Sequence, residues 1–401
     1  MTKGAVVVQK FGGTSVADTQ RIIEISKKIT AELNGGNKVV AVISAMAGTT
    51  NTLLNYCRKI STLTSDQELN SLDFVLSSGE NISSGLVALA LQSKGIKALP
   101  LQGWQIPICT NEQSGKALIT YINAELILRY LALDFVPVIC GFQGINSNNQ
   151  ITTLGRGGSD ITAVAIAAAI SAERCDIYTD VTGVYSADPR FILAAKHIDS
   201  IQYDQMLEMT YSGAKVMHPR SIEIAKEFQL DLRVISSFDT AQGTKIKANN
   251  IMELSKIVGI AHNQNILLVK IYGCKSLSFL LLHLNKLSIN ISSAFFQDDS
   301  IFLISNLGEQ GRLEMALKVS LSNQNIFTSF QIYSDVAMVN IIGSKLLNEQ
   351  EAIDRVFKVI ENFSIQYLHI DHSKISILLK EADMHELTKI LHKKLLETDL
   401  I

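Results

Sequence analysis

Residues 6–15 combine an apolar run with a lysine, two glycines and two hydroxyl side chains. The apolar part is typical of a strand, and residues 19–33 have the spacing of a helix. A strand, a glycine turn and a helix in this order bring free backbone N–H groups and a helix N-terminus to one point, which suits a phosphate. Lys10 adds a full positive charge beside Gly12 and Gly13. This segment is therefore a candidate phosphate site.

A second glycine-rich segment, Thr152–Asp160, leads into a helix predicted for Ile161–Ala172. It contributes the guanidinium group of Arg156, which can bind a carboxylate or a phosphate through two parallel hydrogen bonds. One glycine-rich turn is a weak signal, but two turns that each open a helix and each carry a cation are a stronger one. The P-loop spacing G-x-x-x-x-G-K-[ST] and the dinucleotide-binding spacing G-x-G-x-x-G are both absent from the sequence.

Two further candidates have an ordinary structural explanation as well. Ser44–Asn51 follows a predicted strand, where small and hydroxyl side chains could contact a ligand. Thr50 could equally be the cap of the next helix. Glu80 lies in an otherwise apolar helical stretch, and an acid in such a place usually faces solvent. It would matter for function only if that helix lined the pocket.

Two later segments also have both a functional and an ordinary structural interpretation. Tyr178–Arg190 is rich in turn-forming and polar residues, so it could contact the ribose and base of a nucleoside or form an ordinary loop. Ser212–Pro219 contains Lys215, which could be a ligand or a solvated lysine. His218 precedes a proline there and is interpreted as structural rather than catalytic.

These candidates include cations and glycines but no obvious general base, which favours phosphoryl transfer to a carboxylate. A carboxylate with a pKa of ~4 is already ionised at neutral pH and needs no base. The obstacle is the repulsion between two anions, about 4 kcal/mol for unit charges ~4 Å apart at an effective dielectric constant of ~20. Lys10, Lys215, backbone N–H groups and Mg²⁺ could offset this repulsion as the transition state forms.

The elements that position these residues alternate between strand and helix up to about residue 240. Val39–Ile43 and Val136–Cys140 are continuous apolar runs, typical of strands buried on both faces. Helical spacing predicts helices over Leu72–Leu91 and Gly115–Leu133. Apolar strands between helices indicate an α/β fold, a mainly parallel sheet between two helical layers.

The pattern changes after Thr244. Residues 245–255 are polar and rich in asparagine, which predicts a linker. Two successive β-α-β-β-α rounds of about 65 residues follow and have the character of a degenerate internal repeat.

Composition narrows the class of protein. A chain of 401 residues predicts two or three domains, and a net charge of −2 without charge runs gives no reason to expect nucleic-acid or membrane binding. The five cysteines are scattered, as in a cytoplasmic protein with reduced thiols. The longest apolar stretch, Ile161–Ala172, is shorter than a membrane span, and the N-terminus does not have the pattern of a signal peptide.

The segments in their order resemble one family, aspartate kinase, which makes 4-phospho-L-aspartate from L-aspartate and ATP. The resemblance extends over residues 3–246 and is specific because the ordered set does not recur elsewhere. It rests on KFGGTSV (Lys10–Val16), SAMAGTTN (Ser44–Asn51), SSGE (Ser77–Glu80), GFQG (Gly141–Gly144), TLGRGGSD (Thr153–Asp160), TDVTGVYSADPR (Thr179–Arg190) and GAKVMHPRS (Gly213–Ser221).

The resemblance implies an amino-acid-kinase αβα sandwich over residues 1–246, a linker at 247–262, and two ferredoxin-like α+β ACT modules. The modules are expected at 263–330 and 331–401 and could interleave. It also implies MgATP as the phosphoryl donor, phosphoryl transfer to the side-chain carboxylate, and a place at the start of lysine, diaminopimelate, threonine and methionine synthesis. No protein-bound metal site is expected.

The same resemblance implies roles for individual residues. Lys10 and Asp160 would be catalytic, with Asp160 organising the lysines. Glu80 would pair with the substrate ammonium, and Arg156 would bind a substrate carboxylate. The remaining aspartate contacts would be Thr50, Gly157, Gly158 and Ser159, and the nucleotide side would consist of Lys10, Phe11, Gly12, Gly13, Ser44, Thr179, Asp180, Tyr185, Asp188, Arg190 and Lys215.

The C-terminal third resembles the ACT modules more weakly. Asn290–Ile291 matches the usual residues before an ACT strand, whereas Cys274–Leu277 and Asp371–Ser373 depart from the family pattern. Lysine or threonine is therefore a possible effector, and a homodimer or higher oligomer through these modules is expected. Met252 could be an internal start for a short regulatory subunit, although an ordinary methionine is the preferred interpretation. A regulatory amino-acid-binding protein with an inactive kinase scaffold is the alternative, but Lys10, Arg156 and Asp160 are all present.

Overall fold

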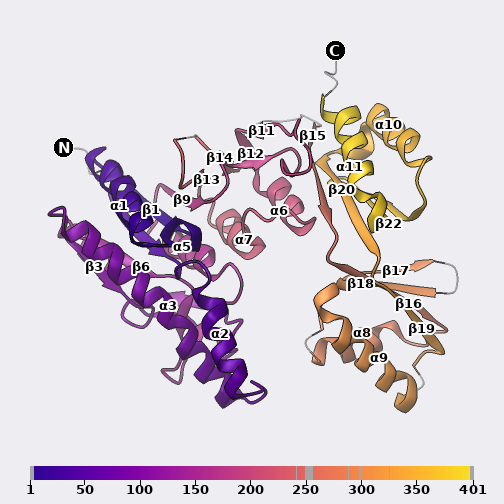
Figure 1. The fold of residues 1–401 in the computed structure, drawn as a ribbon, viewed down its shortest axis with the longest axis horizontal. Coiled ribbons are helices and arrows are strands. Elements are labelled where there is room, and N and C mark those ends of the chain that lie inside the picture. The colour runs from indigo at the N-terminus through magenta and orange to yellow at the C-terminus, as the bar shows by residue number, and fades with distance from the viewer. Residues whose placement is uncertain are drawn as a thin grey trace. The chain divides into compact units, whose positions relative to one another are not determined.

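The computed structural model describes residues 4–240, 242–248, 256–287, 289–297, 300–324 and 326–397. The described residues form two compact units (Figure 1). Unit 1 takes those within Met1–Tyr185, His197–Thr210 and Lys215–Met252, and unit 2 takes those within Ser186–Lys196, Tyr211–Ala214 and Glu253–Ile401.

Unit 1 is built on an eight-stranded sheet with the strand order β12-β14-β13-β9-β1-β2-β6-β3. All neighbouring strands are parallel except β13 and β14, which are antiparallel. The mainly parallel sheet predicted from the sequence is therefore confirmed. The strands are β1 (Val6–Phe11), β2 (Lys38–Ile43), β3 (Ala98–Leu101), β6 (Val136–Cys140), β9 (Arg174–Thr179), β12 (Ser200–Gln202), β13 (Leu232–Ser236) and β14 (Thr244–Lys247).

Helices cover both faces of this sheet, because successive strand residues point to opposite faces and both sets are apolar. Val39, Ala41 and Ile43 pack with residues of α1 and α3 in one core, while α5 packs against β1, β2 and β9. The helices of the unit are α1 (Thr19–Asn34), α2 (Thr49–Ile60), α3 (Asp66–Gln92), α4 (Glu125–Ala132), α5 (Gly158–Ala169), α6 (Tyr203–Tyr211) and α7 (Pro219–Glu227), with a 3-10 turn at Gly13–Val16.

Helix α3 begins earlier than its apolar spacing predicts. Ser65 and Glu68 form a capping box, in which each side chain accepts from the backbone N–H of the other residue. By length and composition α3 alone among the described helices could cross a membrane, and half of its apolar window is buried inside the structure. A core helix of a globular protein has the same features.

The helix predicted over Gly115–Leu133 is wrong in its first half. Ile119–Ile122 forms strand β5, and only Glu125–Ala132 is helical. The β-branched and aromatic side chains of Ile119, Thr120 and Tyr121 favour a strand, and β4 provides the antiparallel partner. The sheet β5-β4-β7-β8 also contains β4 (Ile108–Thr110), β7 (Gln143–Ile145) and β8 (Ile151–Thr153), and β10 (Val184–Tyr185) pairs separately with β11 (His197–Ile198).

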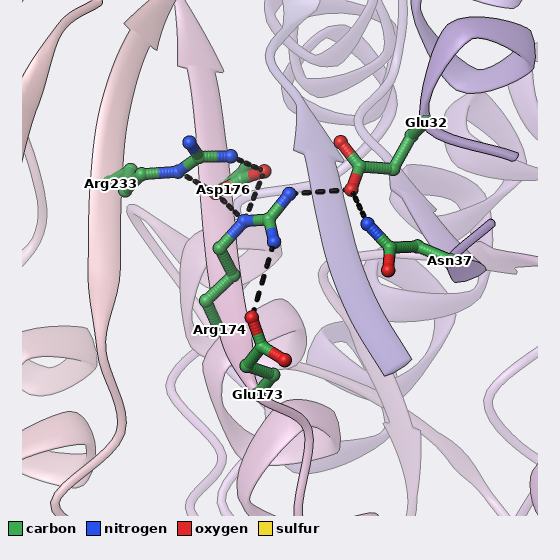
Figure 2. A network of polar contacts seen from close by, with 6 residues as sticks. All are labelled: Glu32, Asn37, Glu173, Arg174, Asp176 and Arg233. Atoms are coloured by element: carbon green, nitrogen blue, oxygen red, sulfur yellow. Dashed lines mark hydrogen bonds and ion pairs between the residues drawn. The ribbon is translucent and has the colours of Figure 1, made fainter. Parts of the chain in front are cut away.

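A buried ionic network fastens α1 to β9 and β13 (Figure 2). Asp176 is fully buried and accepts two hydrogen bonds of 2.6 Å from Arg233, while the Nε of Arg174 lies 3.3 Å from the same carboxylate. Arg174 also pairs with Glu32 of α1 at 2.6 Å, and Asn37 donates to that glutamate.

Replacing Asp176 by asparagine is expected to lower the free energy of unfolding by about 3 kcal/mol, because two half-buried guanidinium groups lose their shared counter-ion. Urea denaturation followed by circular dichroism measures the change. Glu173→Gln is the control, since Glu173 is largely exposed and 3.7 Å from Arg174, so its loss should cost under about 1 kcal/mol. Equal losses in both variants would show that the network does not stabilise the fold.

Unit 2 contains two four-stranded antiparallel sheets, each with two helices. The first has the order β17-β18-β16-β19 and the second β15-β20-β22-β21. The first consists of β16 (Ile266–Tyr272), α8 (Leu277–Lys286), β17 (Ile291–Gln297), β18 (Ser300–Asn306), α9 (Gln310–Gln324) and β19 (Ser329–Tyr333); the second of β15 (Lys256–Asn263), β20 (Val336–Ser344), α10 (Gln350–Ile360), β21 (Ile365–Ile370), β22 (Lys374–Lys380) and α11 (Met384–His392), followed by a π-helical turn at Lys393–Glu397.

Strand β15 makes the two modules interleave along the chain. It precedes the first module in sequence but pairs with β20 of the second, in the place that β19 has in the first sheet. The predicted linker at 247–262 is therefore too long, because a strand begins at Lys256. This strand forms because it pairs with β20, a partner far away in the sequence. Met252 lies outside the described residues. Within the unit, the rings of Phe295 and Tyr367 stack at 3.9 Å between the two sheets.

Candidate active site

A cavity of about 340 Å³ lies in unit 1 at the carboxyl ends of β1, β2 and β6 and at the first turn of α5. Ligands of parallel α/β sheets commonly bind at this edge. The glycine-rich segments and Glu80 meet here although they lie far apart in the sequence. The lining consists of Lys10, Gly13, Ser44, Ala45, Met46, Ala47, Gly48, Thr50, Asn51, Glu80, Phe142, Gly155, Arg156, Gly157, Gly158, Ser159 and Asp160.

The cationic side of the cavity is held by an ion pair. The Nζ of Lys10 lies 2.6 Å from Oδ1 of Asp160, and both side chains are almost completely buried. Lys10 comes from β1, and Asp160 from the first turn of α5, where the helix cannot satisfy its own N–H groups. Asp160 thus fixes a charged lysine beside Gly12 and Gly13.

The anionic side is Glu80, which reaches the cavity from the buried face of α3. Its Oε1 accepts from the N–H of Ala45 at 3.0 Å, whereas its Oε2 has no hydrogen-bond partner among the described residues. Burial raises the pKa of Glu80 to about 7. Glu80 lines the cavity and has a buried carboxylate oxygen without a hydrogen-bond partner among the described residues, so it is suited to pair with a cation.

The loop that carries Arg156 depends on two left-handed glycines. Gly155 has a φ of +78° and Gly157 a φ of +68°. A Cβ on Gly157 would come within 2.3 Å of the Cβ of His218. His218 itself accepts from the N–H of Arg220 at the start of α7, which agrees with its predicted structural role.

All of the residues predicted for catalysis and aspartate binding line this one cavity: Lys10, Asp160, Thr50, Glu80, Arg156, Gly157, Gly158 and Ser159. Gly13 and Ser44 from the predicted nucleotide side line it as well. The remaining lining residues belong to the same sequence motifs but were not predicted individually: Ala45, Met46, Ala47, Gly48, Asn51, Phe142 and Gly155.

The other nucleotide-side candidates do not line the cavity. Thr179 is the last residue of β9, beside the end of β1, and its hydroxyl donates to the carboxylate of Asp180, which follows the strand. The ring of Phe11 is buried against that of Tyr178 at 4.7 Å, and Lys215 is exposed.

Three residues at the end of the 179–190 segment are divided between the units. The hydroxyl of Tyr185, in unit 1, bonds Thr182. Asp188 and Arg190 belong to unit 2 and pair with each other at 2.6 Å, which lowers the pKa of Asp188. A nucleotide role for these residues stays a prediction.

Comparison with known proteins agrees with this geometry. Residues 5–236 match the model of the amino acid kinase family. An aspartokinase of Rickettsia felis is 40% identical over 387 residues, covering 94% of this chain and 96% of the relative. Aspartokinase III of E. coli, in complex with aspartate and ADP in the R-state, has a TM-score of 0.82 and 25% identity, covering 97% and 99% of the two chains. The same enzyme in complex with lysine and aspartate in the T-state has a TM-score of 0.76 and 26% identity, covering 98% and 99%.

The chain therefore belongs to the amino acid kinase family. Within that family it is an aspartokinase, an enzyme of the phosphotransferase class. The family, the fold class and the enzyme class predicted from the sequence are confirmed.

Proposed function

We propose that this protein transfers the γ-phosphoryl group of MgATP to the side-chain carboxylate of L-aspartate, giving ADP and 4-phospho-L-aspartate. One observation carries the proposal: a single cavity combines a lysine held by Asp160 with a buried glutamate and an arginine loop. Aspartate has one ammonium group and two carboxylates. The cavity offers one acidic side chain, Glu80, for the ammonium group and two basic side chains, Lys10 and Arg156, for the carboxylates. The relatives named aspartokinase, one of them bound to aspartate and ADP, support the same assignment.

In this proposal Glu80 binds the substrate ammonium through its unpartnered Oε2, and Arg156 binds the α-carboxylate. Thr50, Ser159 and the backbone of Gly157 and Gly158 hold the rest of the amino acid. The side-chain carboxylate then points toward Lys10. This carboxylate is ionised at neutral pH, so the protein supplies orientation and charge rather than a base.

Lys10 and the N–H groups of Gly12 and Gly13 would hold the phosphates and stabilise the charge that develops on the transferred group. Thr179, Asp180, Tyr185, Asp188, Arg190 and Lys215 are proposed as contacts for the rest of ATP. No group of three His, Cys, Asp or Glu side chains in the described parts of the chain could hold a metal ion. Mg²⁺ would therefore enter with the phosphates of ATP, whose negative charge it neutralises.

Release of ADP by the purified full-length chain, with MgATP and with or without L-aspartate, tests this proposal. We expect ADP release that depends on aspartate, together with an acyl phosphate that hydroxylamine traps as the hydroxamate. Phosphorylation of glutamate or uridylate in preference to aspartate would contradict the proposed substrate.

We also propose a regulatory role for unit 2, as paired ACT modules that respond to lysine or threonine and join chains into a dimer or higher oligomer in the cytoplasm. The product would then enter the synthesis of lysine, diaminopimelate, threonine and methionine. The lysine complex of the E. coli enzyme supports an amino-acid effector. Titrating millimolar lysine and threonine, alone and together, into the assay tests this, and an unchanged rate would contradict it.

A further inference from the structure

The segment that leads into the Arg156 loop is held at its start by two side chains of opposite charge type, the buried Asp73 and the half-buried Arg220. Thr153 and Leu154 immediately precede Gly155, and residues 115–117 run beside them: the N–H of Ala117 donates to the carbonyl of Thr153 at 2.9 Å. The Arg156 loop also packs closely against residues 115–117, since a Cβ on Gly155 would lie 3.0 Å from the carbonyl oxygen of Gly115.

Asp73 of α3 binds the N–H groups of both segments. Its carboxylate is fully buried and accepts from the N–H of Gly115 at 2.9 Å and from the N–H of Thr153 at 3.0 Å. The hydroxyl of Thr153 donates to the other oxygen at 2.6 Å. A buried carboxylate needs such donors, so both segments are tied to one point on α3.

Arg220 of α7 binds the carbonyl groups of the same two segments. Its Nη1 donates to the carbonyl of Leu154 at 2.9 Å, and its Nη2 donates to the carbonyl of Ala117 at 3.0 Å. The planar guanidinium group can make both bonds at once in a fixed geometry, which a lysine cannot do.

Helix α3 also connects this support to the opposite wall of the cavity. Asp73 and Glu80 are seven residues apart, so they lie on one face of the helix two turns apart. Glu80 holds the N–H of Ala45, and the hydroxyl of Ser83 donates to the carbonyl of Ser44 at 2.7 Å. Helix α3 therefore contacts both the loop that begins at Ser44 and the segment that leads into the Arg156 loop, and it fixes the spacing between them.

We propose that Asp73 and Arg220 form a clamp that positions the Arg156 loop for substrate binding, so that both are positioning residues for the reaction. The proposal rests on the proposed function, because it assigns Arg156 to the substrate side of the cavity. It predicts that weakening the clamp impairs the binding of aspartate much more than that of ATP.

The test compares the Michaelis constants of the full-length chain and of Asp73→Asn, Arg220→Lys and Asp176→Asn. The first two variants should raise KM for aspartate about tenfold or more and change KM for ATP less than about twofold. Asp176→Asn is the matched control, a buried aspartate whose loss destabilises the unit away from the cavity, and it should not raise KM for aspartate selectively. The clamp is refuted if the clamp variants keep the wild-type KM for aspartate, or if they raise both constants alike.

Hydrogen–deuterium exchange provides a readout that does not depend on activity. Weakening the clamp should increase deuterium uptake in residues 113–117 and 153–158 and leave uptake in β1 unchanged. If the wild-type chain shows no reaction with aspartate, the proposed function fails, and the clamp is then judged by exchange alone, where unchanged uptake overturns it. If Asp73→Asn does not fold, Arg220→Lys alone tests the clamp. This variant keeps the positive charge but cannot donate to the carbonyl groups of Leu154 and Ala117 at the same time.

Discussion

Replacing Lys10 by alanine is expected to lower kcat by about 10²- to 10³-fold, because one fixed charge at the transferred phosphoryl group is lost. The structure gives a specific reason for a large effect. Lys10 is almost completely buried, and Asp160 holds its ammonium group at 2.6 Å. The charge is therefore in place before the substrates bind, and the enzyme does not have to reorganise during the reaction.

Initial rates of ADP release at saturating aspartate and MgATP measure this effect. Lys38→Ala is the matched control, since Lys38 belongs to the adjacent strand β2 but lies at its first residue, where it pairs with Asp134. The control should keep nearly the wild-type kcat. Circular dichroism must show that Lys10→Ala is folded, because the substitution leaves Asp160 without its partner. A folded variant with near-normal turnover would remove Lys10 from the mechanism.

The part of the cavity that contains Lys10 and the glycine turn could be predicted from the sequence because its signal is local. The apolar run, the glycines and the helix are contiguous, and the structure places β1, the 3-10 turn and α1 in that order. The same holds for β6, whose predicted range Val136–Cys140 agrees with the structure. Strand β5 was missed because its pairing with β4 depends on a partner outside the segment. Strand β15 was missed because it completes a sheet whose other strands begin only at Val336, far along the chain.

The supports of the site were harder to predict than the site itself. Arg220 lies within the motif Gly213–Ser221, but its two carbonyl partners come from other parts of the chain. Asp73 had one signal that could have revealed it, since it precedes Glu80 by seven residues and so shares a helix face with it. An acid at that spacing from a buried acid is itself expected to be buried and to need donors.

Glu80→Gln is expected to raise KM for aspartate about 100-fold or more, which corresponds to about 3 kcal/mol, because the substrate ammonium group would lose its buried counter-ion. The pKa of about 7 adds a pH dependence. Only ionised Glu80 can pair with the ammonium group, so KM for aspartate in the wild type should rise up to about tenfold per pH unit below pH 7. At saturating aspartate kcat should change much less, since the bound ammonium group keeps Glu80 ionised.

Measuring the thermal stability of Glu80→Gln shows whether its higher KM comes from the lost ion pair or from damage to the fold. Because the folded-state pKa of Glu80 is raised above its ordinary value of 4.5, folding favours the protonated form, and this contribution is lost as the pH rises through about 7. Glu80→Gln is neutral at every pH and should therefore be more stable than the wild type at pH 8 and nearly equal to it at pH 4. Thermal unfolding at the two pH values, beside KM measured from pH 6 to 8, tests both consequences. A variant that is less stable at pH 8, or a wild-type KM that does not depend on pH, would contradict a buried Glu80 that ionises to bind the substrate.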